Sequence, residues 1–148
     1  MPVTEDEGGR RSRTLRCALL ENLFAVCQLP SDAPIPEWAL SGELLSITRA
    51  TDELSIVCLA QNVPAGVKAD GPWICLKLEG PFPFLQTGVL ASFIDPLADA
   101  GIPIFAISTY NTDFVLIKEE YWGAALAALS NAGHELISDD KSWRKLIE

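Results

Sequence analysis

The sequence predicts an α+β protein built from tandem ferredoxin-like units, the second with the full order β-α-β-β-α-β and the first an abbreviated copy. Two observations carry this prediction. Residues 73–138 contain four strand-like apolar runs and two amphipathic segments in the order of a split βαβ fold. The pattern T-x-x-T-D occurs at Thr48–Asp52 and again at Thr109–Asp113, each time between two apolar runs. We therefore expect antiparallel sheets with helices on one face, and a first half that is an abbreviated relative of the second.

The first half divides at its prolines and glycines. Residues 1–13 mix charges and glycine without a hydrophobic period, so we expect a disordered tail. Pro36 is well placed to open a short helix through Trp38. An abbreviated unit is expected at 14–66, followed by a connector rich in proline and glycine at 62–72. Its expected strands are 15–20, 23–29, 44–48 and 54–60.

The second half, 72–138, has clearer boundaries. Thr87 can cap a helix because its hydroxyl can accept a free backbone N–H, and Gly101 and Gly133 are suited to ending helices. Pro96 lies inside the first helix and should kink or shorten it. Residues 139–148 are expected to form a tail or short helix. The expected elements are strand 73–79, helix 88–100, strands 102–109 and 114–118, helix 119–132 and strand 134–138.

Composition argues against several classes of partner. The formal net charge of −9 disfavours nucleic acid, whose binding needs clustered Lys and Arg, and it disfavours anionic membrane surfaces. No segment reaches the roughly 18–20 apolar residues of a spanning helix, and the N-terminus lacks a signal-peptide pattern. The cysteines lie singly inside apolar runs, as reduced core thiols do. We expect a cytoplasmic protein that contacts neither nucleic acid nor membrane. The cysteines are Cys17, Cys27, Cys58 and Cys75.

Patterns for catalysis or metal binding are weak. His134 is the single histidine and has no nearby cysteine, so we interpret it as structural or exposed rather than as a general base. Residues 80–88 contain glycine and proline without the phosphate-binding motif. Arg49 can pair with Asp52 or anchor a carboxylate, and the local ion pair is the favoured interpretation. We expect no enzymatic activity, no cofactor and no metal, and rank an enzyme third among the possible functions.

The topology brings two polar segments to one end of the second half. In a βαββαβ sheet the loop Gly80–Gly88 and the turn Ser108–Asp113 share an end. Free amides at the helix start near Thr87 favour a carboxylate, and Asp113 could hold an ammonium or guanidinium. Together they complement a free amino acid. The alternative is that Thr112 and Asp113 only stabilise a tight turn and that Thr87 only caps the helix.

Motifs in this half resemble those of a known family. Residues 72–137 resemble an ACT domain, most closely the type found in aspartate kinase regulatory regions and in the animal cytosolic arginine sensors. Leu44–Cys58, with Arg49-Ala50-Thr51-Asp52, is similar to the companion unit of small bacterial tandem-ACT proteins. The segments that carry the ACT resemblance are Gly80-Pro81, Thr87-Gly88-Val89-Leu90-Ala91, Leu97-Ala98-Asp99-Ala100-Gly101-Ile102 and Ile104–Asp113.

The resemblance implies regulation by amino-acid binding at a seam between paired ACT units, within one chain or across a dimer. Asp113 matches an acidic ligand contact in the arginine sensors. This chain has one ACT pair where the animal sensors have two, so we expect a homodimer, and a regulated protein partner is possible. The alternative is a protein-interaction or dimerisation module with a vestigial pocket. The implied ligand-facing residues are Leu85, Thr87, Gly88, Val89, Ser108, Thr109, Thr112 and Asp113.

Overall fold

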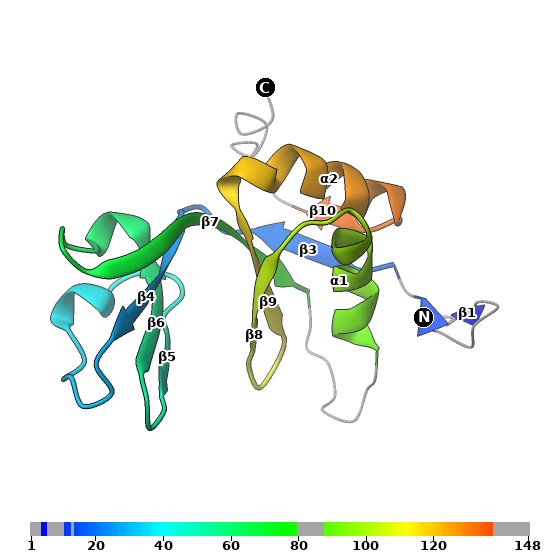
Figure 1. Ribbon diagram of the computed structural model, residues 1–148. Helices are drawn as coiled ribbons and strands as arrows, with labels where there is room; N and C mark the ends of the chain where they lie inside the picture. Colours follow the sequence, from blue (N-terminus) through cyan, green and yellow to red (C-terminus); the bar gives the residue numbers. More distant parts are fainter. Residues whose placement is uncertain (1–3, 6–10, 13, 80–87, 138–148) are drawn as a thin grey trace. The chain divides into compact units, whose positions relative to one another are not determined.

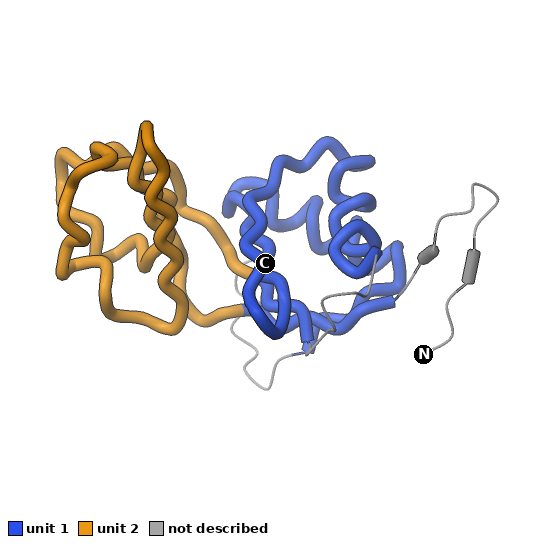
Figure 2. The backbone as a smooth tube through the Cα atoms, turned by 90° about the horizontal axis from the view of Figure 1, so that it is seen from below, with its two compact units in different colours: residues 1–19, 76–148 blue, residues 20–75 orange. Residues whose placement is uncertain are grey.

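A computed structural model describes residues 4–5, 11–12, 14–79 and 88–137 of the chain (Figure 1). The chain forms two compact units, which are coloured separately in Figure 2. One unit consists of residues 20–75, and the other combines residues 1–19 with residues 76–148. We call them the inserted unit and the C-terminal unit, because the first interrupts the sequence of the second.

The C-terminal unit has the expected β-α-β-β-α-β order, and its elements are β7 (Lys68–Leu78), α1 (Val89–Asp99), β8 (Ile104–Ser108), β9 (Asp113–Lys118), α2 (Trp122–Asn131) and β10 (Glu135–Ile137). Strand β9 pairs with both β7 and β8. The two helices pack against each other, as expected of helices on one face of a sheet (Figure 1). Their buried side chains include Phe93, Leu97, Trp122 and Leu129. The predicted α+β, ferredoxin-like class is confirmed.

A further strand, β3 (Arg16–Leu19), lies between the first and last strands of this motif. It pairs antiparallel with β7, where Cys17 faces Leu78, and parallel with β10, where Cys17 faces Leu136. Residues 14–19, which the sequence grouped with the first half, therefore belong to the C-terminal unit. Alternating burial explains the placement, because Leu15 and Cys17 lie in the core while Arg16 is exposed.

The inserted unit is a small antiparallel sheet in the order β7-β4-β6-β5. Its strands are β4 (Phe24–Leu29), β5 (Ser46–Arg49), β6 (Leu54–Leu59) and the first part of β7. Strands β4 and β6 pair over six residues and provide most of a core that includes Cys27, Ile56 and Cys58. The helical elements of the unit are the short 3-10 helices η1 (Glu37–Ala39) and η2 (Ala60–Asn62).

Strand β7 is longer than the sequence indicated. The expected strand began at Trp73 and the preceding residues were interpreted as a connector, but Lys68–Asp70 pair with β4. The N-terminal residues also differ from expectation. Thr4–Glu5 (β1) and Arg11–Ser12 (β2) form a short antiparallel pair in the segment for which we expected disorder. Both pairings depend on a partner strand that local composition does not identify.

Glycines end both helices of the C-terminal unit where the sequence placed them. After α1, Gly101 adopts a left-handed φ of +73°, and Ile102 N–H donates to Leu97 O. After α2, Gly133 has a φ of +89°, and His134 N–H donates to Leu129 O. These bonds satisfy carbonyls that the last helical turn would leave free. Residues Glu119–Tyr121, expected as the first turn of α2, form the 3-10 helix η3.

Candidate functional site

The turn between β8 and β9 is closed by its own polar groups. Ser108 Oγ donates to Asp113 Oδ1 at 2.5 Å, across the last pair of the β8–β9 ladder. Thr109 donates twice to Thr112 O, from its N–H at 2.8 Å and from its hydroxyl at 3.0 Å. Tyr110 at the tip is 79% exposed. These contacts hold Ser108, Thr109, Thr112 and Asp113 in one defined arrangement.

Thr112 also joins this turn to the end of strand β7. Its side chain is buried, and its Oγ1 donates to Leu78 O at 2.6 Å. Leu78 is the last residue of β7, from which the chain passes through residues 80–87 to helix α1. The turn therefore lies at the strand end from which the path to the helix begins, as the topology predicted.

Among the residues that the structure describes, none provides a capping side chain at the start of helix α1. Gly88 occupies the N-cap position with a φ of +78° and makes no side-chain capping bond. The first turn contains no acidic residue. The backbone N–H of Ser92 begins the helical pattern by donating to Gly88 O at 3.0 Å. The amides of Val89, Leu90 and Ala91 precede that first bond, so they can donate to an anion.

The ligand-facing residues expected from the sequence separate into three groups. Leu85 and Thr87, including the expected cap by Thr87, lie outside the described residues. Gly88 and Val89 begin α1, but the Val89 side chain is buried, so only its backbone can face a ligand. Ser108, Thr109, Thr112 and Asp113 come together in the turn. Their hydrogen bonds close the turn and join it to β7, so contact with a ligand stays a prediction.

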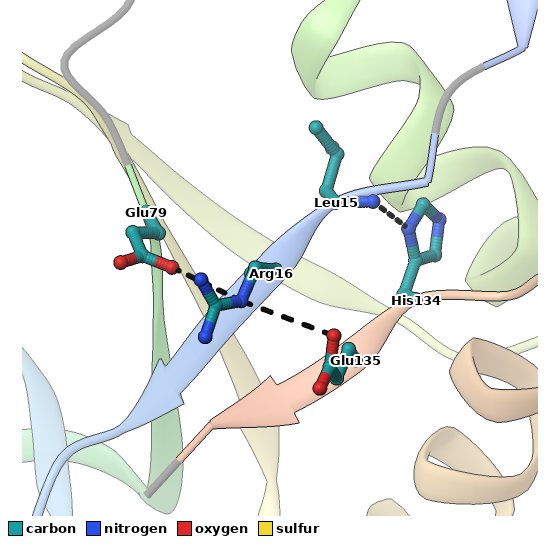
Figure 3. A network of polar contacts seen from close by, with 5 residues as sticks. All are labelled: Leu15, Arg16, Glu79, His134 and Glu135. Atoms are coloured by element: carbon teal, nitrogen blue, oxygen red, sulfur yellow. Dashed lines mark hydrogen bonds and ion pairs between the residues drawn. The ribbon is translucent and has the colours of Figure 1, made fainter. Parts of the chain in front are cut away.

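Arg49 does not make the favoured ion pair with Asp52. Its guanidinium instead donates to the backbone carbonyls of Ser31 and, at 2.8 Å, Ala33. The fork of N–H donors of an arginine suits two carbonyls as well as a carboxylate. Arg49 therefore fixes the proline-rich loop that follows β4. Ion pairs do join Arg16 to Glu79 and to Glu135 (Figure 3).

His134 connects three segments of the C-terminal unit. Its Nδ1 accepts from Leu15 N–H at 3.0 Å (Figure 3), and its Nε2 lies 2.8 Å from Ser92 O. Since Leu15 contributes a donor, we assign the proton to Nε2, which donates to Ser92. Burial lowers the pKa of His134, while the bond to Ser92 O raises it by a smaller amount. The interpretation of His134 as a structural histidine agrees with these contacts.

Pro96 explains why Ser92 O is available to His134. Proline has no N–H, so it cannot donate to the carbonyl four residues earlier, which belongs to Ser92. His134 supplies a donor there. The helix spans Pro96 and continues to Asp99 instead of ending early. A proline inside a predicted helix was the sequence signal that a carbonyl at position 92 needed a partner from elsewhere.

The four cysteines are buried free thiols. Burial raises the pKa of Cys17 to about 12, and it also raises the pKa of Cys75. In the described part of the chain, no group of three His, Cys, Asp or Glu residues is arranged to hold a metal ion. Within the same residues, no helix is long and apolar enough to cross a membrane.

The β-α-β-β-α-β order and the pairing of β9 with both β7 and β8 define an α+β protein of the ferredoxin-like class. Comparison with known proteins identifies the family. The model of the ACT domain matches residues 68–131, and a second family model, of an N-terminal domain, matches residues 22–66. A protein of Agrobacterium tumefaciens with a solved structure is 38% identical, covering 87% of this chain and 96% of its own, with a TM-score of 0.81. The chain belongs to the ACT domain family.

Other matches are more distant. A Vibrio cholerae protein described as a possible transport protein is 22% identical, with a TM-score of 0.64 over 80% of this chain and 90% of its own. The regulatory subunit of aspartate kinase from Thermus flavus is 15% identical, with a TM-score of 0.57 over 82% of this chain and 99% of its own. These two likenesses show the fold. The human protein CASTOR3P is 41% identical over 56 residues, which is 33% of this chain and only 34% of the human protein.

Proposed function

We propose that this protein is a regulatory sensor that binds a free amino acid and has no catalytic activity of its own. The observation that supports this function most directly is the bond from Thr112 to Leu78, which fixes an acidic turn at the strand end leading to helix α1. Membership of the ACT family points the same way. The regulatory subunit of aspartate kinase from Thermus flavus shares the fold, which also supports this function.

The proposed site separates the two charges of an amino acid. Asp113 accepts the ligand's ammonium or guanidinium, since an ionised carboxylate forms strong charge-assisted bonds with both groups. The amides at the start of α1, from Val89 to Ala91, donate to the ligand's carboxylate, which the helix dipole also favours. Ser108 and Thr109 line the polar side of the turn. Leu85 and Thr87 complete the set that the family resemblance implies.

A single ACT pair supplies only part of such a site, so we propose that two copies of the chain associate and that the ligand binds at a seam between ACT units. Ligand binding would then change the oligomeric state or the affinity for a protein partner. We place this activity in the cytoplasm, where buried cysteines stay reduced.

A thermal-shift screen of the twenty amino acids tests the proposal. A ligand at 100 times its Kd stabilises the folded protein by about 2.7 kcal/mol, which for a chain of this size raises Tm by roughly 8 °C. Arginine and lysine are expected to give the largest shifts. Asp113→Asn should abolish the shift, whereas Asp52→Asn, the matched change in the other T-x-x-T-D turn, should leave it intact. A screen without a stabilising amino acid would count against ligand binding, and a shift that survives Asp113→Asn would count against this site.

An interaction module with a vestigial pocket is the second candidate. The bond from Ser108 to Asp113 favours it, because one carboxylate oxygen is already engaged within the turn. Light scattering with and without the amino acids, followed by pull-down, separates the two functions. A sensor changes its mass or its captured partner when ligand is added. An interaction module shows the same dimer and the same partner in both conditions.

A further inference from the structure

Ser108 and Asp113 lie directly opposite each other in the last pair of the β8–β9 ladder. The side chains of such a pair project from the same face of a sheet, with their Cβ atoms about 5 Å apart. The register therefore brings the Ser108 hydroxyl to the carboxylate of Asp113, and Oγ donates to Oδ1 at 2.5 Å. Because this bond follows from the strand pairing, it is a fixed property of the turn.

The serine and threonine hydroxyls of the turn have no proton left for a ligand. Ser108 donates to Asp113. Thr109 donates to the carbonyl of Thr112, whose own hydroxyl donates to Leu78 O. A hydroxyl that has donated its one proton can still accept through its lone pairs. Ser108 is exposed and can accept in this way, whereas Thr112 is buried and Thr109 Oγ1 already receives the Thr112 N–H. These side chains offer a ligand acceptors and no donors, which suits a cation.

The two carboxylate oxygens of Asp113 are not equivalent. Oδ1 carries the bond from Ser108, while Oδ2 accepts no hydrogen bond from the parts of the chain that the structure describes. Asp113 is half-buried, so its carboxylate is partly open to a ligand. The acceptors left for a cation are therefore Oδ2 of Asp113 and, next to the same carboxylate, Oγ of Ser108.

Guanidinium and ammonium groups use such acceptors differently. A guanidinium binds a carboxylate best through two parallel N–H bonds, one to each oxygen. At Asp113 the Ser108 hydroxyl already occupies one direction of approach to Oδ1, so a guanidinium loses this paired geometry. An ammonium is a compact charge with three rotatable donors, and it can bond to Oδ2 and to Ser108 Oγ at the same time.

We propose, building on the proposed amino-acid sensor, that Asp113 and Ser108 select a ligand that presents a primary ammonium rather than a guanidinium. Asp113 supplies the negative charge and accepts the first ammonium N–H at Oδ2. Ser108 sets the preference, because it occupies Oδ1 and accepts a second N–H. This assignment separates two ligands that the proposed function treats alike, lysine and arginine.

L-lysine and L-arginine are matched probes, because they share the α-ammonium, the carboxylate and the net charge and differ in the side-chain cation. Isothermal titration calorimetry of the full chain should give a Kd about tenfold lower for lysine, since arginine loses one charge-assisted bond. The backbone amide peaks of Ser108 and Asp113 should shift in the ¹H–¹⁵N spectrum as lysine binds. If the two amino acids bind equally, or arginine binds more tightly, the ammonium preference is wrong although the sensor function stands.

Variants of Ser108 test its role. Ser108→Ala opens Oδ1 to a guanidinium and should bring the two affinities to within about twofold of each other. Ser108→Thr keeps the hydroxyl and should keep the preference, and Ser46→Ala, a control on β5, should change neither affinity. An undiminished lysine preference in Ser108→Ala would show that Ser108 does not set it. The wild-type comparison stands even if Ser108→Ala fails to fold. If neither amino acid binds the wild type, the proposed function itself fails, and this assignment fails with it.

Discussion

Replacing His134 with leucine removes an imidazole that satisfies two backbone groups from different segments. Leu15 N–H would lose its acceptor and Ser92 O would lose the donor that compensates for Pro96. A buried group left unsatisfied costs about 1–3 kcal/mol and the partly buried Ser92 O somewhat less, so the variant should lose about 2–5 kcal/mol of unfolding free energy. His134→Gln retains one acceptor and one donor and should recover part of this loss.

The pH dependence of stability gives the same substitution an independent signature. The pKa of His134 is lowered in the folded protein, mainly by burial. The unfolded chain therefore takes up the proton first, near the ordinary histidine pKa of about 6.5. The contribution of His134 is complete above that pH and is lost as the pH falls below it, at no more than about 1.4 kcal/mol per pH unit. Because His134 is the only histidine, leucine should remove this component.

Urea unfolding followed by tryptophan fluorescence at pH 7.5, 6.5 and 5.5 measures both effects. Amide hydrogen exchange of Leu15 provides the local readout, because the Leu15 N–H donates a hydrogen bond to His134 Nδ1. We expect faster Leu15 exchange in His134→Leu and an intermediate rate in His134→Gln. Two results would refute the reasoning: equal pH slopes for wild type and His134→Leu between pH 7.5 and 5.5, or unchanged exchange at Leu15.

Three further tests of individual contacts use urea unfolding, two of them with a control substitution. In a Pro96→Ala background His134→Leu should cost about 1 kcal/mol less, because the new N–H at position 96 can serve Ser92 O; additive effects would contradict this explanation. Gly88→Ala should destabilise by about 1–2 kcal/mol through its left-handed φ, whereas Gly123→Ala, in open space on α2, should stabilise by about 0.5–1 kcal/mol; equal effects would exclude backbone strain. Thr112→Val should cost about 1–2 kcal/mol by leaving Leu78 O unpaired, more than Thr109→Val in the exposed turn; the reverse order would show that the link to β7 is not the stabilising contact.

Local chemistry accounts for the part of the fold that the sequence predicted. Gly101 and Gly133 mark helix ends because a left-handed residue there costs glycine little. The turn at Ser108–Asp113 is recognisable because short polar side chains bond to neighbouring backbone and to each other. These interactions join residues that are only a few positions apart, so the local sequence already contains both partners of each bond.

Non-local pairing accounts for what the sequence did not predict. The apolar alternation around Cys17 indicates a strand, but it cannot show that the strand lies between β7 and β10. Arg49 likewise has a nearby acidic residue, Asp52, and yet bonds to carbonyls sixteen and eighteen positions away. An ion pair at the surface is worth little, so two carbonyl bonds can outweigh it. At the candidate site, the sequence allowed two roles for Asp113, ligand binding and stabilisation of the turn, and did not decide between them.

The position of β3 has a consequence for how this ACT unit holds together. The chain leaves the C-terminal unit after Leu19 and returns at Leu76, and these two residues face each other across the β3–β7 ladder. The inserted unit therefore begins and ends at adjacent strands, where the entropy of closing the loop is offset by strand pairing. The His134–Leu15 bond and the Arg16–Glu135 ion pair tie the start of β3 and the residue before it to the residues that follow α2. Residues 72–138 alone would lack the strand between β7 and β10. The β-α-β-β-α-β motif thus describes the chain order of the C-terminal unit, but the unit becomes a complete sheet only with residues from before the insertion.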